Sequence, residues 1–294
     1  MKGILLAGGT ASRFYPASLA VSKQLAPVYD KPAVYYPLST LMLAGVRDIL
    51  LISGPDTQVQ FQRLLGDGSS LGLDIRYAIQ PEPRGLAQAL TIGAGHIGDD
   101  TVALALGDNL HHGHGLSELL QRNARSVHGC VLFGVEVDDP ENFGVVELDD
   151  SGMALSIEEK PAVPRSNQAV TGLYFYDNEA VGIAEKVRPS ARGELEITAV
   201  NREYLSRGTA RVVRLGPGFG WLDLGTPEGV LEAAQYVHVM ASRHRTQVGC
   251  VEEVALRMGL IDAAACYRLG EAMRNSAYGR YVMETASCAG YVTG

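Results

Sequence analysis

Apolar runs and amphipathic stretches alternate along the first half of the chain. Short runs with strand character occupy residues 3–7, 48–53, 75–78 and 101–106, and helical segments are predicted between them near residues 37–44, 58–65 and 86–97. Such alternation is typical of a parallel sheet with helices on both faces. The run 101–106 is apolar almost throughout, which indicates a strand buried on both sides.

The middle of the chain is richer in strands, and its end is helical. Strands are predicted at residues 130–137, 145–148, 155–158 and 169–176, and helices at 196–205, 228–242, 251–258, 262–273 and 276–285. Residues 289–294, rich in glycine and threonine, are expected to be loose. The pattern therefore predicts one α/β domain followed by a helical C-terminal appendix.

The composition is that of an ordinary packed protein. Of 294 residues, 46% are hydrophobic and 20% charged, which suffices for a sizeable core. The net charge of −8 disfavours a general role on DNA or RNA, so we expect no nucleic-acid partner. Four cysteines without a C-x-x-C pair favour free thiols over a zinc site or a disulfide framework. With no signal peptide or membrane-spanning run in the sequence, we expect a cytoplasmic protein without a membrane partner.

The first predicted strand ends in a glycine-rich segment that suits phosphate binding. Gly8 and Gly9 follow it directly, Arg13 comes next, and Lys23 supplies a second cation. Paired glycines let backbone N–H groups approach an anion, and arginine adds a permanent forked charge. The segment is neither the G-x-G-x-x-G fingerprint nor a Walker loop. A tight strand-to-helix turn with a solvated arginine is the alternative interpretation.

Two acids, Asp108 and Asp223, are candidates for holding a divalent cation. Asp108 follows the buried strand, and ligands of open α/β sheets bind at the carboxyl ends of strands. Asp223 lies in an apolar, glycine-flanked segment beside Trp221. Mg²⁺ is usually held by one or two carboxylates together with phosphate oxygens. The alternatives are a capping role for Asp108 and a turn role for Asp223 before a helix that begins near Pro227.

Other polar clusters carry weaker signals. Glu159 and Lys160 end a predicted strand, where they could bind sugar hydroxyls and a phosphate or could be a solvated charge cluster. Arg192 is a further cation beside a predicted helix start. The segment 111–114, with three histidines, is interpreted as a loop and not as a metal site, because no Cys or His cluster supports it.

Ten motifs spread over nearly the whole chain resemble the sugar-1-phosphate nucleotidylyltransferases, and specifically the glucose-1-phosphate thymidylyltransferases. They are residues 6–9 (LAGG), 22–32 (SKQLAPVYDKP), 35–45 (YYPLSTLMLAG), 85–89 (GLAQA), 107–109 (GDN), 143–147 (FGVVE), 158–161 (EEKP), 170–177 (VTGLYFYD), 189–198 (PSARGELEIT) and 221–223 (WLD).

The resemblance implies a Mg²⁺-dependent reaction in which dTTP and glucose 1-phosphate give dTDP-glucose and pyrophosphate. It implies direct attack of the sugar phosphate on the α-phosphorus, which depends on positioning and charge stabilisation and needs no protein nucleophile. It also implies a Rossmann-like, mostly parallel twisted sheet flanked by helices, with a smaller β-rich sugar-binding portion. The expected division is a nucleotidyltransferase domain over 1–240, with a nucleotide half near 1–125 and a sugar half near 126–240. A helical segment is expected over 241–294, and the chain is expected to form a homotetramer.

The resemblance also assigns roles to residues. Those expected at the nucleotide are Leu6, Ala7, Gly8, Gly9, Gln24, Gln80, Gly85 and Asp108, with Gln80 and Gly85 against the thymine edge. Those expected at the sugar phosphate are Gly144, Glu159, Lys160, Val170, Tyr174 and Arg192. The expected catalytic groups are Arg13, Lys23, Asp108, Lys160 and Asp223, with Asp108 and Asp223 holding Mg²⁺.

Two departures from the family pattern bear on function. Ala11-Ser12 replaces the usual Gly-Thr of the phosphate loop, and Pro217 replaces an arginine that belongs to a second, regulatory nucleotide site in relatives. The first leaves open a nucleotide-sugar-binding regulator without turnover. A further alternative is the same chemistry with UTP or with another sugar phosphate, as in a secondary-metabolite pathway.

Overall fold

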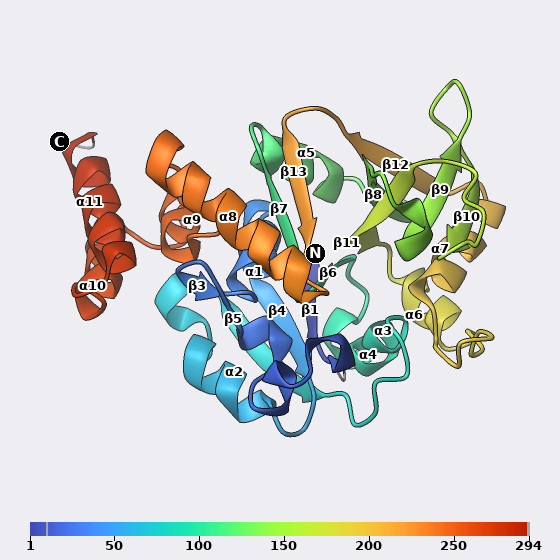
Figure 1. Cartoon of the computed structure of the whole chain (residues 1–294), viewed down its shortest axis with the longest axis horizontal. Helices are drawn as coiled ribbons and strands as arrows, with labels where there is room; N and C mark the ends of the chain where they lie inside the picture. Colours follow the sequence, from blue (N-terminus) through green and yellow to red (C-terminus); the bar gives the residue numbers. More distant parts are fainter. Residues whose placement is uncertain (10, 293–294) are drawn as a thin grey trace.

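A nine-stranded sheet forms the centre of the computed structural model, which describes residues 1–9 and 11–292 (Figure 1). Seven strands follow the order β10-β9-β11-β6-β1-β4-β5, while β8 pairs with β11 and β12 pairs with β8. The first four strands of this sheet along the chain pair in parallel with one another. They are β1 (Lys2–Ala7), β4 (Asp48–Ser53), β5 (Asp74–Ile79) and β6 (Val102–Leu106).

The remaining strands make the second half of the sheet mixed. The long strand β11 is antiparallel to β6, β8 and β9, and it therefore joins the two halves. The strand β12 extends the sheet parallel to β8, and β10 pairs antiparallel with β9. These strands are β8 (Cys130–Glu136), β9 (Gly144–Leu148), β10 (Ala154–Glu159), β11 (Gln168–Tyr176) and β12 (Ala210–Leu215). The predicted mostly parallel sheet flanked by helices is confirmed.

Helices cover both faces of the sheet because side chains of successive strand residues point to opposite faces. Leu5 and Ala7 of β1 belong to one core cluster, whereas Ile4 and Leu6 belong to another. The first cluster packs on α1 (Tyr35–Leu43), α2 (Gln58–Leu65), α5 (Leu116–Ala124) and α9 (Val251–Arg257). The second packs on α3 (Gln88–Ile92), α4 (Ala94–Ile97), α6 (Glu179–Ala184) and α7 (Ile197–Ser206).

The helix predicted over 86–97 is interrupted at Gly93, which separates α3 from α4. A Cβ atom at Gly93 would lie 2.5 Å from Cδ1 of Ile4. The glycine thus allows the chain to approach β1 closely, and it weakens the helix at that point.

Two small antiparallel sheets complete the strands. They are β2 (Pro27–Val28) with β3 (Lys31–Pro32), and β7 (Asn109–Gly113) with β13 (Phe219–Asp223). The loop predicted for the histidine segment is therefore wrong, since His111 and His112 lie in β7. Trp221 and Gly220 of β13 are their ladder partners. Single-turn 3₁₀ helices lie at η1 (Ser12–Phe14), η2 (Ala17–Leu19), η3 (Lys23–Leu25), η4 (Ser69–Leu71) and η5 (Pro140–Asn142).

The C-terminal part is helical, as predicted. Figure 1 shows α10 and α11 at the opposite end of the molecule from β9 and β10, with the long helix α8 between. These helices are α8 (Pro227–His244), α10 (Ala263–Ala272) and α11 (Ala277–Val292). No helix among residues 1–9 and 11–292 is both long and apolar enough to cross a membrane.

The expectation of a loose segment over 289–294 is wrong for residues 289–292, which continue α11. Val282 and Ala286 of this helix are buried against Cys266 of α10. No proline interrupts the helix after them, and a lone glycine costs only about 1 kcal/mol. Residues 293–294 lie outside the described residues.

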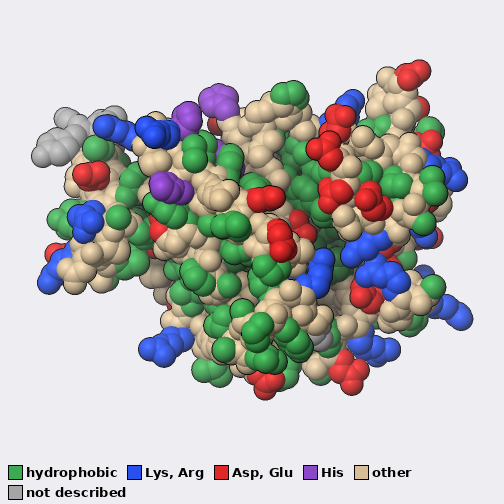
Figure 2. All heavy atoms as spheres, in the orientation of Figure 1, with side chains coloured by type: hydrophobic (Ala, Val, Ile, Leu, Met, Phe, Trp, Pro, Cys, Tyr) green, Lys and Arg blue, Asp and Glu red, His purple; other side chains and the backbone are tan. Residues whose placement is uncertain are grey.

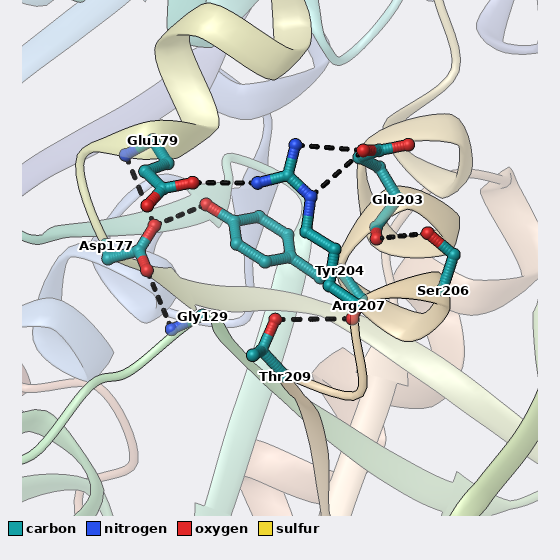
Figure 3. A network of polar contacts seen from close by, with 8 residues as sticks. All are labelled: Gly129, Asp177, Glu179, Glu203, Tyr204, Ser206, Arg207 and Thr209. Atoms are coloured by element: carbon teal, nitrogen blue, oxygen red, sulfur yellow. Dashed lines mark hydrogen bonds and ion pairs between the residues drawn. The ribbon is translucent and has the colours of Figure 1, made fainter.

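A polar network fixes α6 and α7 to the sheet end formed by β8 and β11 (Figure 3). Asp177, directly after β11, accepts hydrogen bonds from Tyr204 Oη (2.5 Å) and from the backbone N of Gly129 (2.7 Å). Arg207 pairs with Glu179 and Glu203 at 2.7 and 2.8 Å. Burial and the hydrogen bond to Asp177 raise the pKa of Tyr204, so the hydroxyl stays a donor. This network lies at the opposite end of β11 from Gln168 and Val170.

Candidate active site

The residues expected at the nucleotide gather at the carboxyl ends of the parallel strands. Leu6 and Ala7 end β1, Gln80 follows β5, and Asp108 follows β6. Because these strands run parallel within one sheet, their carboxyl ends lie along the same edge of it. Figure 2 shows acidic and basic side chains close together at the middle of the visible face, over the region where β1, β6 and β11 lie in Figure 1.

The glycine segment after β1 is in contact with two glutamines. Gln24 donates a hydrogen bond from Nε2 to the carbonyl oxygen of Gly8 (3.2 Å), and Ser22 Oγ donates to Gln24 Oε1 (2.6 Å). A Cβ atom at Gly8 would stand 2.3 Å from Gln80 Oε1, so only glycine leaves room for the Gln80 amide. Gly9 has φ +110°, a backbone conformation that glycine adopts at no steric cost. The glycine segment expected to bind phosphate and the glutamine expected to bind the base, Gln80, thus lie side by side.

Ala11 adopts the left-handed conformation, with φ 46° and ψ 35°. Its carbonyl accepts hydrogen bonds from Ser18 Oγ (2.8 Å) and Phe14 N (2.9 Å), which hold the backbone in place. A non-glycine residue in this region carries a strain of about 1–2 kcal/mol. The departure from the family's glycine therefore falls at the position that needs a positive φ.

We expect the double variant Ala11→Gly/Ser12→Thr to raise kcat/KM for dTTP by a few-fold. The reason is that relief of about 1 kcal/mol of strain corresponds to less than tenfold, since about 1.36 kcal/mol is tenfold. Steady-state kinetics at saturating glucose 1-phosphate measure the change. Ala11→Val is the matched control and should lower the same quantity, because a β-branched residue tolerates a positive φ worst. An unchanged or lower kcat/KM in the double variant would contradict the strain argument.

Asp108, Lys23 and Asp223 form the centre of the site. Lys23 Nζ makes an ion pair with Asp108 Oδ2, and both side chains are largely buried. Burial acts to raise the pKa of Asp108, but the charge and hydrogen bond of Lys23 outweigh it and hold that pKa below its usual range. Burial, and then the Asp108 carboxylate, raise the pKa of Asp223 to about 6. Two carboxylates from segments more than 100 residues apart in sequence are thus close enough to repel.

The small sheet β7–β13 brings these acids together. Asp223 pairs with Asn109 in the ladder, and Leu224 N donates to the carbonyl oxygen of Asp108 (2.8 Å). Asn109 is buried and donates from Nδ2 to Asp108 Oδ1 (3.3 Å). Its Oδ1 accepts from Trp221 Nε1 (2.6 Å) and from Gly172 N (3.2 Å), so this amide at the start of β7 joins β7, β11 and β13. Neither acid is a simple cap or a surface turn residue.

The donor set at these acids suits a hard divalent cation. It consists of carboxylate oxygens only, and no group of three or more His, Cys, Asp or Glu residues able to hold a metal occurs among the described residues. Mg²⁺ matches such a site because it requires only one or two protein carboxylates when substrate phosphates supply the other oxygens. A soft or borderline metal would need thiolate or imidazole ligands.

The expected sugar-binding residues lie on β9, β10 and β11. Gly144 opens β9, and a Cβ atom there would lie 3.4 Å from Glu159 Oε2 at the end of β10. Thr198 Oγ1 donates 2.5 Å to the same Glu159 oxygen and fixes the carboxylate. Tyr174 of β11 is buried, and burial together with the charges of Glu159 and Asp108 raises its pKa. Tyr174 is therefore close enough to interact electrostatically with both Glu159, in the expected sugar pocket, and Asp108.

Arg192 is surrounded by carboxylates. Its guanidinium lies 3.4–3.6 Å from Glu159, Glu194 and Glu196. Ser190 Oγ donates to Glu196 (2.9 Å), and burial raises the pKa of that glutamate. The arginine is half-exposed, with 41% of its side chain accessible, so it can contact a phosphate without leaving these acids.

Lys160 and Arg13 have no ion-pair partner among the described residues. Lys160 follows Glu159 with φ 42°, and its backbone N donates to the carbonyl oxygen of Phe143 (2.9 Å). Arg13 is exposed in η1, and its charge acts to lower the pKa of Asp223. Lys160 thus combines a strained backbone with an unpaired charge, and residues with a strained backbone cluster at functional sites. Val170 is buried in β11 close to its start.

The loop that carries Gly85 is bound to the loop that carries Arg192. Leu195 N donates to the carbonyl oxygen of Arg84 (2.7 Å), and Ala87 N donates to the carbonyl oxygen of Leu195 (3.0 Å). A Cβ atom at Gly85 would lie 2.4 Å from the Leu195 backbone, so glycine permits the close approach. The predicted base-binding and sugar-phosphate-binding loops are therefore directly connected.

Sequence reasoning gave no role to several residues that organise the site. Gln88, Asn109, Thr198 and Glu196 each lie inside a quoted family motif, but only the folded chain shows which predicted residue each one contacts. The single tryptophan was a usable signal, because a lone Trp beside an acid is rarely placed by chance on a surface.

Comparison with known proteins agrees with this geometry. The family profile described as "Nucleotidyl transferase" matches residues 2–239. A glucose-1-phosphate thymidylyltransferase of Neisseria gonorrhoeae is 52% identical over 283 residues, which cover 96% of this chain and 98% of that protein. One from Mycobacterium tuberculosis (strain CDC 1551 / Oshkosh) is 52% identical over 284 residues, covering 97% and 98% of the two chains.

Solved structures show the same fold. A Bacillus anthracis protein assigned to that enzyme class, crystallised with a sucrose, superposes with a TM-score of 0.74 at 36% identity, covering 80% of this chain and 94% of that one. A UDP-glucose pyrophosphorylase complexed with UDP-glucose superposes with a TM-score of 0.69 at 23% identity, covering 81% and 98%, which bears on the fold alone. The chain belongs to the nucleotidyl transferase family, whose members generally use a divalent cation.

Proposed function

We propose that the chain transfers a thymidylyl group from dTTP to glucose 1-phosphate and releases pyrophosphate, giving dTDP-glucose. The observation that carries the proposal is the position of Asp108. It contacts Lys23 beside the nucleotide segment, raises the pKa of Asp223, and acts electrostatically on Tyr174, which Glu159 of the sugar pocket also affects. Relatives at about half identity over nearly the full length carry this activity in their names.

The protein's part in the proposed reaction is positioning and charge. Gly8, Gly9 and Arg13 would receive the triphosphate, and Lys23 would contact the phosphates near the reacting phosphorus. Lys160 and Arg192 would hold the phosphate of glucose 1-phosphate, whose oxygen attacks the α-phosphorus. Because no protein nucleophile takes part, the rate depends on holding two anions in line and on neutralising their charge.

Asp108 and Asp223 are the residues that would hold Mg²⁺. When bound there, the ion would neutralise negative charge on the phosphate oxygens, and its positive charge would offset the repulsion between the two carboxylates. Lys23 would then be released to the phosphates from its ion pair with Asp108.

A pyrophosphate-release assay tests the proposed function. It combines dTTP, dUTP, UTP and dCTP with glucose 1-phosphate and other sugar 1-phosphates. We expect the highest kcat/KM for dTTP with glucose 1-phosphate. A preference for UTP or for another sugar would favour the related pathway enzyme, and no turnover with any pair would favour the regulator.

We expect weak or absent inhibition by dTDP-rhamnose, the end-product type of nucleotide. Pro217 lies in an exposed segment between β12 and β13, and a proline supplies neither a charge nor a backbone N–H. An arginine–phosphate pair is charge-assisted and often bidentate, so its loss removes a main contact. Dose–response curves at several dTTP concentrations measure the effect, and Pro217→Arg should strengthen inhibition. Potent inhibition of the natural chain that is not competitive with dTTP would refute the expectation.

The proposed division of the chain remains a nucleotidyltransferase domain over 1–240, with halves near 1–125 and 126–240, and a helical segment over 241–294. The homotetramer is a prediction of the resemblance, and the cytoplasmic location is a prediction of the sequence pattern. Analytical ultracentrifugation of the full chain tests the first of these.

A further inference from the structure

A second glutamine, Gln88, contacts Gln80, the residue proposed to bind the base. Gln88 is the first residue of α3, and its Oε1 accepts a hydrogen bond from Gln80 Nε2 at 2.8 Å. The same oxygen accepts the backbone N–H of Arg84 at 3.2 Å. Two donors from different segments therefore converge on one carbonyl oxygen.

The contact with the Arg84 backbone assigns the oxygen and nitrogen atoms of the Gln88 and Gln80 side-chain amides. The N–H of Arg84 is shared between the carbonyl oxygen of Glu82 (2.9 Å) and Gln88 (3.2 Å), and because it can only donate, the atom of Gln88 that faces it is the oxygen. The atom of Gln80 that faces this oxygen must then be a donor, which is its NH₂ group. The ambiguity between O and N in a glutamine amide is thus resolved by the hydrogen-bond network.

The oxygen of the Gln80 amide is the atom that remains available to accept a hydrogen bond from a ligand. Gln80 Oε1 accepts no hydrogen bond from residues 1–9 or 11–292, and it lies against Gly8, where a Cβ atom would stand 2.3 Å away. The Gly85 N–H donates no hydrogen bond to the described residues either. The proposed base pocket thus offers one acceptor, from Gln80, and one donor, from Gly85.

We propose that Gln88 is a positioning residue that locks the Gln80 amide with its oxygen toward the base and so selects bases that carry an N3–H group. This inference rests on the proposed function for the identity of the pocket. Thymine and uracil offer an N3–H donor beside a carbonyl oxygen, which complements the Gln80 oxygen and the Gly85 N–H. Cytosine has a lone pair at N3, which faces the Gln80 oxygen unfavourably.

Without Gln88 the Gln80 side-chain amide is free to rotate so that its oxygen and nitrogen exchange places. Its NH₂ group can then donate to N3 of cytosine, and the penalty against cytosine falls. A site with a fixed hydrogen-bonding group discriminates strongly because the wrong ligand leaves polar groups unpaired. Loss of the fixed orientation should therefore change selectivity more than it changes stability.

The test measures dissociation constants of dTTP, dCTP and dUTP by calorimetry for the full chain, without sugar phosphate. Gln88→Met removes the acceptor at similar volume, and Gln88→Ala is a second acceptor-free variant if the first does not fold. Gln88→Glu is the matched control, because a carboxylate oxygen still accepts from Gln80 and Arg84. We expect the preference for dTTP over dCTP to fall by roughly tenfold in the acceptor-free variants and to persist in Gln88→Glu.

The preference between dTTP and dUTP should stay unchanged in every variant, since both bases carry N3–H. An unchanged dTTP/dCTP ratio in the acceptor-free variants would overturn the inference. An equal loss in Gln88→Glu, or a parallel change in the dTTP/dUTP ratio, would overturn it as well. The binding measurement does not depend on turnover, so failure of the proposed reaction in the pyrophosphate assay is a separate result.

Discussion

Replacing Asp108 or Asp223 by asparagine is expected to lower kcat by roughly 10²- to 10³-fold, the range typical for loss of one group that stabilises transition-state charge. Each variant removes one of the two carboxylates proposed to hold the divalent cation while leaving the shape of the side chain almost unchanged. Pyrophosphate release at saturating dTTP and glucose 1-phosphate measures the loss. Raising the Mg²⁺ concentration should recover part of the activity, because weakened metal binding is offset by mass action.

The two variants should differ in stability, which separates catalysis from folding. Asp108→Asn leaves the buried Lys23 charge without its partner, so we expect a lower melting temperature. Burial and then repulsion from Asp108 raise the pKa of Asp223, and Asp223→Asn removes the charge that both oppose, so we expect no loss of stability at neutral pH. Asp150→Asn, in the exposed turn between β9 and β10, is the control and should change neither quantity. Near-normal turnover of either active-site variant at ordinary Mg²⁺ would rule out the metal assignment.

Lys160→Gln is expected to lower kcat/KM for glucose 1-phosphate by roughly 100-fold. Lys160 has no ion-pair partner within the described part of the chain, so its proposed partner is the sugar phosphate itself. Hydrogen bonds to charged groups contribute about 1.5–3 kcal/mol, and about 1.36 kcal/mol corresponds to tenfold. Initial rates measured while each substrate is varied in turn should show the loss on the sugar phosphate and little change in KM for dTTP.

Lys160→Arg tests whether the charge alone suffices. It retains the positive charge with a different geometry, so we expect an intermediate activity. Lys186→Gln, an exposed lysine after α6, is the surface control and should behave like the natural chain. A larger rise in KM for dTTP than for glucose 1-phosphate would place Lys160 on the nucleotide side and contradict its proposed role.

Local patterns in the sequence were sufficient for the parallel part of the sheet. The strand over 102–106 is apolar because both of its faces are covered by helices, and its four residues from Val102 to Ala105 are at most 2% exposed. The glycine-rich segment that leads to Arg13 was also predictable, because the backbone freedom of paired glycines depends on the residues themselves and not on the rest of the fold. Element type was therefore predictable wherever burial on a sheet face imposed a clear hydrophobic pattern.

The small sheet β7–β13 could not be predicted in the same way. Its strands are short, one carries His111 and His112, and their ladder joins residues 109–113 with 219–223. A pairing across that distance leaves no local periodicity, because partners in the ladder are chosen by tertiary packing and not by neighbouring residues. The histidine segment was accordingly predicted as a loop.

By itself, the sequence determined the order of the four parallel strands, the candidate phosphate-binding glycines and the family. Only the tertiary structure decided that Asp108 and Asp223 share one site, that Thr198 fixes Glu159, and that Gln88 orients Gln80. The physical reason is that these contacts join segments up to more than 100 residues apart. Their geometry depends on the β7–β13 ladder and on loops that pack against one another after the sheet has formed.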